Sequence, residues 1–145
     1  GLAAHRGRAE DEALGERGGA ERLVQRARRG AINFHDGPLP RYAGLNTPSW
    51  ALLAGEESHG ITWHSITDGI DEGGIYARAD FDIAPDDSAL TLNTKCFEAG
   101  LAAFADMLPG LEDGSLRPVP QPLRALGARL SRQLADAQAR VIAER

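Results

Sequence analysis

The feature that most constrains this chain is a short apolar run that ends in two polar side chains. Residues 31 and 32 are apolar, Asn33-Phe34-His35 follows, and the Gly- and Pro-rich stretch behind it does not continue a strand. Side chains two positions apart lie on the same face of a β-strand, so Asn33 and His35 would share a face. We therefore predict a short strand over 31–34 that brings an amide and an imidazole side by side.

A glycine-bracketed turn supplies a third polar group further along the chain. The turn runs from Thr67 to Gly74 and contains Asp71, and its glycines allow the backbone to approach a ligand closely. An amide can donate to a developing oxyanion, while an imidazole and a carboxylate can move protons. Asn33, His35 and Asp71 are therefore the candidate catalytic residues, and together they are sufficient to catalyse acyl transfer to an amine.

These motifs resemble the 10-formyltetrahydrofolate-dependent formyltransferase family. The catalytic pattern of that family is Asn-x-His with an Asp 36 residues after the His, and Asp71 follows His35 by 36 residues. The sequence of residues 35–46 is most similar to that of formyl domains attached to peptide synthetases. The stretches that carry the resemblance are Asn33–His35, Pro38–Gly44, Gly55-Glu56, Gly60–Thr62 and Gly69–Gly73.

The resemblance covers residues 30–121 and implies the fold class. Family members normally carry an N-terminal half with the first strands of a Rossmann-like sheet, whereas residues 1–29 do not predict strands. The expected fold is α/β: a partial Rossmann-like formyltransferase fold with three or four strands and flanking helices. We predict a poorly determined N-terminal segment (1–29), a catalytic segment (30–121) and a tail that fits an amphipathic helix (122–145), from a chain either truncated or flanked by unrelated sequence.

The resemblance also implies a folate site. The donor would be 10-formyltetrahydrofolate, with Asn33 holding the oxyanion, His35 polarising the formyl oxygen, and Asp71 tuning His35 and managing the proton. Asp71 taking the amine proton directly or through water is left open. The residues expected to bind the folate, through the turn backbone and the cleft wall, are Leu39, Pro40, Thr67, Asp68, Gly69, Ile70 and Gly73.

The apolar pattern predicts the remaining elements. Thr47 would cap a helix with Pro48 in its first turn, ended by Gly55, and alternation predicts strands over 61–66 and 75–83. Ser88 would cap a long helix that Pro109-Gly110 ends, and residues 10–29 fit either an exposed helix or a disordered segment. Predicted apolar faces are Trp50, Ala51, Leu53 and Ala54 on the first helix and Leu92, Phe97, Leu101, Phe104 and Leu108 on the second, with Trp50 and Trp63 in the core.

Charge and composition narrow the partners. Residues 31–121 hold four basic against fourteen acidic side chains, which opposes binding of a nucleic acid such as tRNA. Cys96 is the single cysteine, and no apolar run approaches a membrane span, so a cytoplasmic protein with no membrane partner is expected. His59 and His64 are five apart on or beside a strand, and a structural role for them is favoured over a metal site.

Three functions stay open at this point. The first is a formyltransferase whose amine acceptor is a carrier-protein-bound aminoacyl group or an amino sugar nucleotide. The second is a hydrolase that passes the formyl group to water. The third is a non-catalytic remnant that acts only as a binding module, because Asn33, His35 and Asp71 taken singly also fit loop and turn roles.

Overall fold

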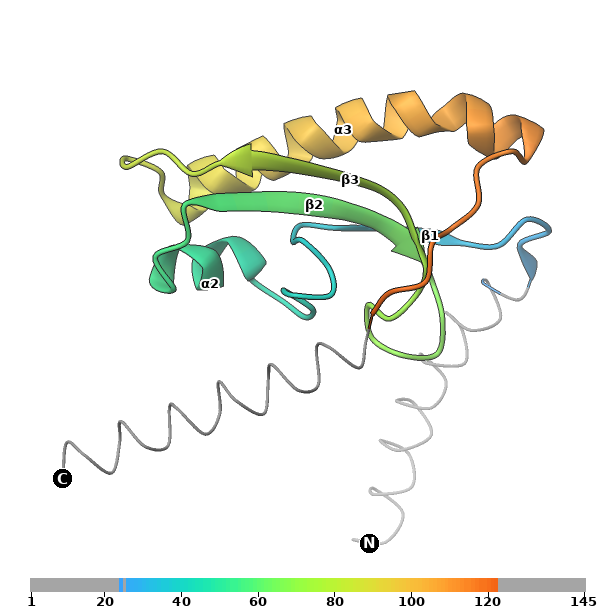
Figure 1. The fold of residues 1–145 in the computed structure, drawn as a ribbon, viewed down its shortest axis with the longest axis horizontal. Coiled ribbons are helices and arrows are strands. Elements are labelled where there is room, and N and C mark those ends of the chain that lie inside the picture. The colour runs from blue at the N-terminus through green and yellow to red at the C-terminus, as the bar shows by residue number, and fades with distance from the viewer. Residues whose placement is uncertain (1–23, 25, 123–145) are drawn as a thin grey trace, which may run out of the picture. The chain divides into compact units, whose positions relative to one another are not determined.

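The computed structural model describes residue 24 and residues 26–122 of the chain. The chain divides into two units, Gly1–Ala31 and Ile32–Arg145. The tail helix predicted after residue 122 lies outside the described residues, as does nearly all of the N-terminal segment. The second unit holds the elements shown in Figure 1: β1 (Ile32–His35), α2 (Thr47–Leu53), β2 (Ser58–Ser65), β3 (Ile75–Asp82) and α3 (Ala89–Asp113).

The strands form an antiparallel sheet in the order β1-β2-β3. Asn33 pairs with His64 and His35 with Thr62, so the polar ends of β1 lie across from polar positions of β2. The predicted α/β class with three strands and flanking helices is confirmed. β2 begins at Ser58, earlier than the predicted 61, because its first residues pair with the far end of β3.

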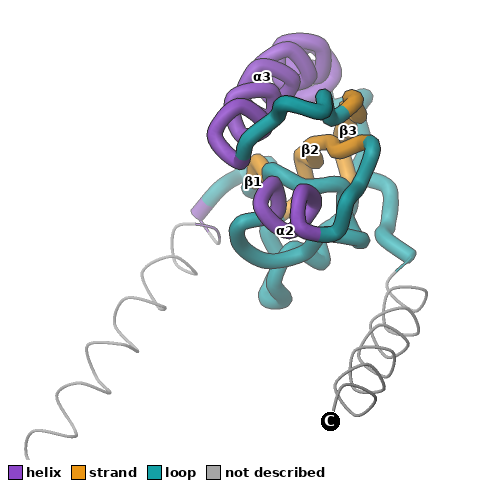
Figure 2. The backbone as a smooth tube through the Cα atoms, turned by 90° about the vertical axis from the view of Figure 1, so that its left-hand side faces the viewer, coloured by secondary structure: helices purple, strands orange, loops and turns teal. Residues whose placement is uncertain are grey.

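Helix α3 packs along one face of the sheet (Figures 1 and 2). On that face the Phe34 and Trp63 rings lie 5.3 Å apart, and the Trp63 indole N–H donates to the Gly100 carbonyl at 3.0 Å. A Cβ on Gly100 would overlap the Phe34 ring, so the glycine sets how closely α3 approaches β1. Because Phe34 faces α3, its neighbours Asn33 and His35 lie on the opposite face.

The apolar stripe predicted for α3 was right at Leu92 and in part at Phe104, whose ring lies 5.1 Å from that of Trp63, and wrong at Phe97, Leu101 and Leu108, which are exposed. The buried positions are Leu92, Cys96, Gly100 and Met107, whereas Phe97 and Leu101 are 54% and 71% exposed. Small residues at 96 and 100 let the helix backbone approach the sheet, and Phe97 beside them stacks on the Phe34 ring while it keeps half of its surface exposed. A pattern search for large apolar residues therefore includes Phe97 and Leu101 and passes over Cys96 and Gly100.

The predicted start of α3 is confirmed and its predicted end is not. Ser88 caps the helix as predicted: its hydroxyl accepts from the Thr91 amide at 3.2 Å, and the Thr91 hydroxyl accepts from the Ser88 amide at 2.9 Å. The predicted end at Pro109 was wrong, since α3 continues to Asp113. The amide of Leu116 donates to the Gly110 carbonyl at 2.9 Å, and Gly114 with φ of 76° ends the helix in the left-handed conformation.

Helix α2 was misjudged at its cap and on its outer face. Thr47 is the first helical residue, Asn46 precedes it with φ of 59°, and the Thr47 hydroxyl donates to the Asp36 carbonyl instead of capping the helix. Ala51 is buried as predicted. Trp50 is 59% exposed, so its assignment to the core was wrong, and Leu53 is exposed as well. A helix of two turns presents few positions to a core, and here the small residues occupy them.

Candidate active site

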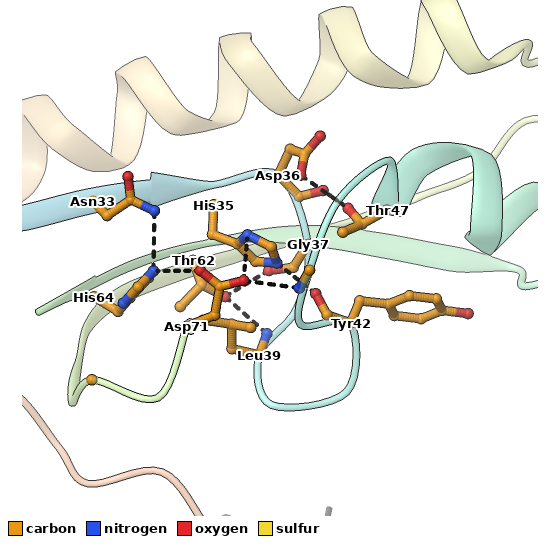
Figure 3. Close-up of polar contacts among 12 residues, drawn as sticks. Asn33, His35, Asp36, Gly37, Leu39, Tyr42, Thr47, Thr62, His64 and Asp71 are labelled. Carbon is orange, nitrogen blue, oxygen red and sulfur yellow. Dashed lines mark hydrogen bonds and ion pairs between the residues drawn. The ribbon is translucent and has the colours of Figure 1, made fainter. Parts of the chain in front are cut away.

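Asn33, His35 and Asp71 lie together on the sheet face opposite α3 (Figure 3). Strand β1 supplies the first two residues, and the turn after β2 supplies the third. The Asp71 carboxylate lies 3.6 Å from His35 Nδ1 through Oδ2 and 3.4 Å from His64 Nε2 through Oδ1. The three groups that the sequence singled out are therefore brought into one cluster, with His64 as a fourth member.

The loop after β1 anchors the Asp71 carboxylate. The Gly44 amide donates to Asp71 Oδ2 at 2.8 Å, which directs the carboxylate back over the strand. Asp71 itself has φ of 53°, a left-handed conformation that a non-glycine residue adopts at a cost of roughly 1–2 kcal/mol. Its contacts with Gly44 and the two imidazoles hold this conformation in place.

His35 has one ring nitrogen committed to structure and one facing the carboxylate. Its Nε2 donates to the Tyr42 carbonyl at 2.5 Å, so Nε2 carries a hydrogen. Nδ1 is then the nitrogen that gains and loses a proton, and it faces Asp71. The two atoms are 3.6 Å apart, slightly more than a hydrogen-bond distance.

His64 is the site residue that the sequence prediction missed. The ring is buried, and its Nδ1 donates to the Ser65 carbonyl at 2.8 Å. In the neutral ring Nε2 is consequently an acceptor, and it accepts a hydrogen bond from the Asn33 side-chain amide at 3.2 Å. In the protonated ring Nε2 would instead donate to the Asp71 carboxylate. The signal that could have revealed His64 is its position directly across from Asn33 in the antiparallel pair.

The loop between β1 and α2 is fastened to β2 by Thr62. The Thr62 hydroxyl donates to the Gly37 carbonyl at 2.8 Å and accepts the Leu39 amide at 3.0 Å. Leu39 is buried, and the peptide bond between Leu39 and Pro40 is cis. Both residues line a cavity of about 350 Å³ with Arg41, Ser58, His59, Arg78 and Asp80.

The residues predicted to bind folate therefore fall into two groups. Leu39 and Pro40 line that cavity, which none of the turn residues reaches. Of the turn residues, Thr67, Asp68 and Ile70 are exposed, Gly69 is half-buried and Gly73 is buried. A Cβ on Gly73 would overlap the Ser65 carbonyl, so the turn requires glycine there. A folate contact for each of these positions stays a prediction.

Two buried groups beneath the loop favour their neutral forms. Burial lowers the pKa of His59 below 6.5, against the opposing effect of the Asp36 carbonyl that its Nε2 contacts at 2.8 Å. Burial, with the nearby Asp36 carboxylate, raises the pKa of the Cys96 thiol to about 12. Neither is therefore a charged participant in the site, and the Cys96 thiol is a poor nucleophile.

Residues 24 and 26–122 contain no group of three His, Cys, Asp or Glu side chains placed to hold a metal ion. Within the same residues, no helix has the length and apolar character needed to span a membrane. The cluster offers an amide donor, two imidazoles and a carboxylate.

Residues 20–108 of the chain match the family model described as Formyl transferase. The N-formyltransferase from Helicobacter canadensis, crystallised with folinic acid and dTDP-3-aminofucose, is 29% identical with a TM-score of 0.60, over 62% of this chain and 34% of that one. PseJ from Anoxybacillus kamchatkensis, in complex with UDP-4,6-dideoxy-4-formamido-L-AltNAc and tetrahydrofolate, is 28% identical with a TM-score of 0.62, over 69% and 52%.

The phosphoribosylglycinamide formyltransferase PurN from Coxiella burnetii is 37% identical with a TM-score of 0.53, over 57% of this chain and 39% of that one. The chain thus spans about a third to a half of the length of these relatives.

Proposed function

The chain belongs to the formyl transferase family, and on that premise we propose that it transfers a formyl group from 10-formyltetrahydrofolate to an amine. The observation that carries the proposal is the convergence of Asn33, His35 and Asp71, from two separate segments, on one side of the sheet. Similarity to proteins crystallised with folinic acid and with tetrahydrofolate supports the folate donor.

The reaction makes three chemical demands that these side chains can meet. The amine nitrogen attacks the formyl carbon, a C–N bond forms and the carbonyl oxygen becomes an oxyanion, to which the Asn33 amide donates. Collapse breaks the bond from the formyl carbon to N10 of the folate. The proton lost by the amine is balanced by the proton gained at N10, and His35 Nδ1 with Asp71 forms the relay between them.

We further propose that the acceptor is a primary amine on a small phosphate-bearing molecule. The two sugar-modifying relatives were crystallised with an amino sugar nucleotide and with a formamido sugar nucleotide, which supports an amino sugar nucleotide as the first candidate. The excess of acidic side chains over residues 31–121 argues against a nucleic acid acceptor.

Calorimetric titration of the full chain with 5-formyltetrahydrofolate, a stable stand-in for the donor, tests the proposal. Saturable binding is expected, weakened about fivefold to a hundredfold by Asp71→Asn, because loss of a buried polar contact costs about 1–3 kcal/mol. The matched control is Asp106→Asn, an exposed carboxylate of α3 on the other side of the sheet, which should leave the affinity unchanged.

Activity is measured next as the release of tetrahydrofolate from 10-formyltetrahydrofolate, with dTDP-3-aminofucose as the amine acceptor. Release that requires the amine supports transfer, and formate released without an amine identifies a hydrolase. A folded chain that neither binds the folate nor releases tetrahydrofolate would overturn the proposal and favour a non-catalytic remnant.

A further inference from the structure

Gln121 is bonded to the turn that carries Asp71, although fifty residues separate it from Asp71 in sequence. Its side-chain amide nitrogen donates to the Asp71 carbonyl at 2.7 Å and to the Gly73 carbonyl at 2.7 Å. Both hydrogens of the amide are therefore used on one short stretch of backbone. The two carbonyls flank Glu72, so one side chain fixes two peptide units of the turn.

The backbone around Gln121 is itself anchored. Val119 forms an isolated antiparallel bridge with Ile75, with the Ile75 amide donating at 2.7 Å and the Val119 amide at 2.8 Å. A Cβ on Gly74 would meet Pro118, so the segment also packs closely against the end of the turn. The bridge at Val119 thus holds residues 118–121 beside the start of β3 and places Gln121 against the turn.

The turn needs outside support at this point. Asp71 lies in the left-handed region, and Gly73 is pressed against the Ser65 carbonyl. A small backbone rotation at residue 71 would move the carboxylate away from His35 Nδ1 and His64 Nε2, which it meets at 3.6 and 3.4 Å. The carbonyl of Asp71 is held by Gln121, while its carboxylate is held by the Gly44 amide.

We propose that Gln121 is a positioning residue for the reaction, acting through Asp71 by fixing the backbone from which the carboxylate meets the two imidazoles. This inference rests on the proposed function for its catalytic consequence, but the positioning itself is a structural statement. The Gln121 Oε1 atom is buried without a hydrogen-bond partner, so the contribution of this side chain to the fold lies in its two N–H donors.

Substitution of Gln121 separates the donor role from simple packing. Gln121→Glu keeps the shape but places a carboxylate oxygen against two carbonyl oxygens. Gln121→Met keeps the approximate volume and removes the donors without adding charge. The control is Val119→Ala, because the Val119 side chain is 66% exposed and its bridge to Ile75 uses only backbone atoms.

Two readouts test the proposal in the full chain. In NMR spectra of ring-labelled histidine, both Gln121 variants should shift the His35 and His64 resonances, while His59 serves as an internal reference, since its ring bonds to Asp36. In the transfer assay both variants should lower kcat tenfold or more, with a smaller change in KM, because displacement of a catalytic group by about 1 Å costs on the order of a hundredfold. Val119→Ala should change neither.

The outcomes are distinguishable from failure of the proposed function. If the Gln121 variants shift the His35 and His64 resonances but the parent chain has no transfer activity, the positioning is upheld and the proposed function is wrong. Unshifted resonances with unchanged kcat, in variants whose melting temperatures match the control, would overturn the positioning. If Gln121→Glu fails to fold, Gln121→Met decides by the same two readouts.

Discussion

At the scale of single residues, the site depends on which ring nitrogen carries a hydrogen. His64 donates from Nδ1 to the Ser65 carbonyl, and its Nε2 is left between the Asn33 amide and the Asp71 carboxylate. It therefore connects the Asn33 amide to the Asp71 carboxylate. His35 shows the same division in reverse, with Nε2 held by the Tyr42 carbonyl.

His64→Asn tests this coupling. The asparagine amide can replace the Nδ1 donor to Ser65 but does not reach Asn33 or Asp71. We expect folding to be retained and kcat in the transfer assay to fall about fivefold to a hundredfold, because loss of one buried polar partner costs about 1–3 kcal/mol. His64→Gln, whose longer amide reaches the Nε2 position, should recover part of the rate. An unchanged kcat in His64→Asn would show that His64 only fills space.

At the scale of elements, small residues decide how α3 lies on the sheet. Gly100 lies against Phe34 of β1 and its carbonyl accepts the Trp63 indole N–H, while the Cys96 thiol donates to the Asp36 carbonyl just after β1. Close approach brings the Phe34 ring against the helix backbone, where a Cβ would overlap it. Phe34 lies between Asn33 and His35, so the packing of α3 on Phe34 also holds the two catalytic candidates in register.

Gly100→Ala should therefore destabilise the fold although alanine favours helices. Overpacking of this kind costs about 1–3 kcal/mol, more than the roughly 1 kcal/mol that alanine gains over glycine in a helix. Urea unfolding followed by circular dichroism measures the difference. Ala102→Ser, at an exposed position of the same helix, is the control and should stay within about 0.5 kcal/mol of the parent. A more stable Gly100→Ala variant would contradict the packing described for Phe34.

At the scale of the whole molecule, a buried histidine links the loop before α2, strand β2 and the core. His59 contacts the Asp36 carbonyl and the Tyr42 and Phe81 rings, and burial lowers its pKa below 6.5. In the unfolded chain the same imidazole takes up a proton as pH falls through about 6.5, whereas the folded chain resists protonation. The stabilising contribution is complete above that pH and is lost below it.

The free energy of unfolding should consequently decrease as pH falls from 6.5 to 5, with His59 contributing a slope of at most about 1.4 kcal/mol per pH unit. The pKa of Asp87 is lowered from 3.8 by its hydrogen bond with Lys95. The effect of this carboxyl on stability therefore falls at about pH 3.8 and below, outside this window. His59→Gln, which keeps an N–H donor, should give a shallower slope in urea titrations at each pH. Equal slopes for parent and variant would show that His59 titrates normally in the fold.

Strong local signals made much of this molecule predictable. Alternation in β3, the Ser88 cap and the polar pair Asn33 and His35 each follow from a few neighbouring residues, and the structure agrees on all three. The errors fall where a residue's environment comes from a distant segment. Trp50 and Leu101 are large apolar residues and were predicted to be buried, but both are exposed, and the helices bury smaller residues near them instead.

The amino-acid order alone specified the strands, the Ser88 cap of α3 and the spacing of Asn33, His35 and Asp71, because these depend on contacts within a few residues or on motif lengths. Only the tertiary structure could assign His64 to the site and connect Gln121 to the turn, since both depend on pairing between segments far apart in the chain. The same holds for the rotation of α3, where close packing against Phe34 outweighs the preference of each large apolar side chain for burial.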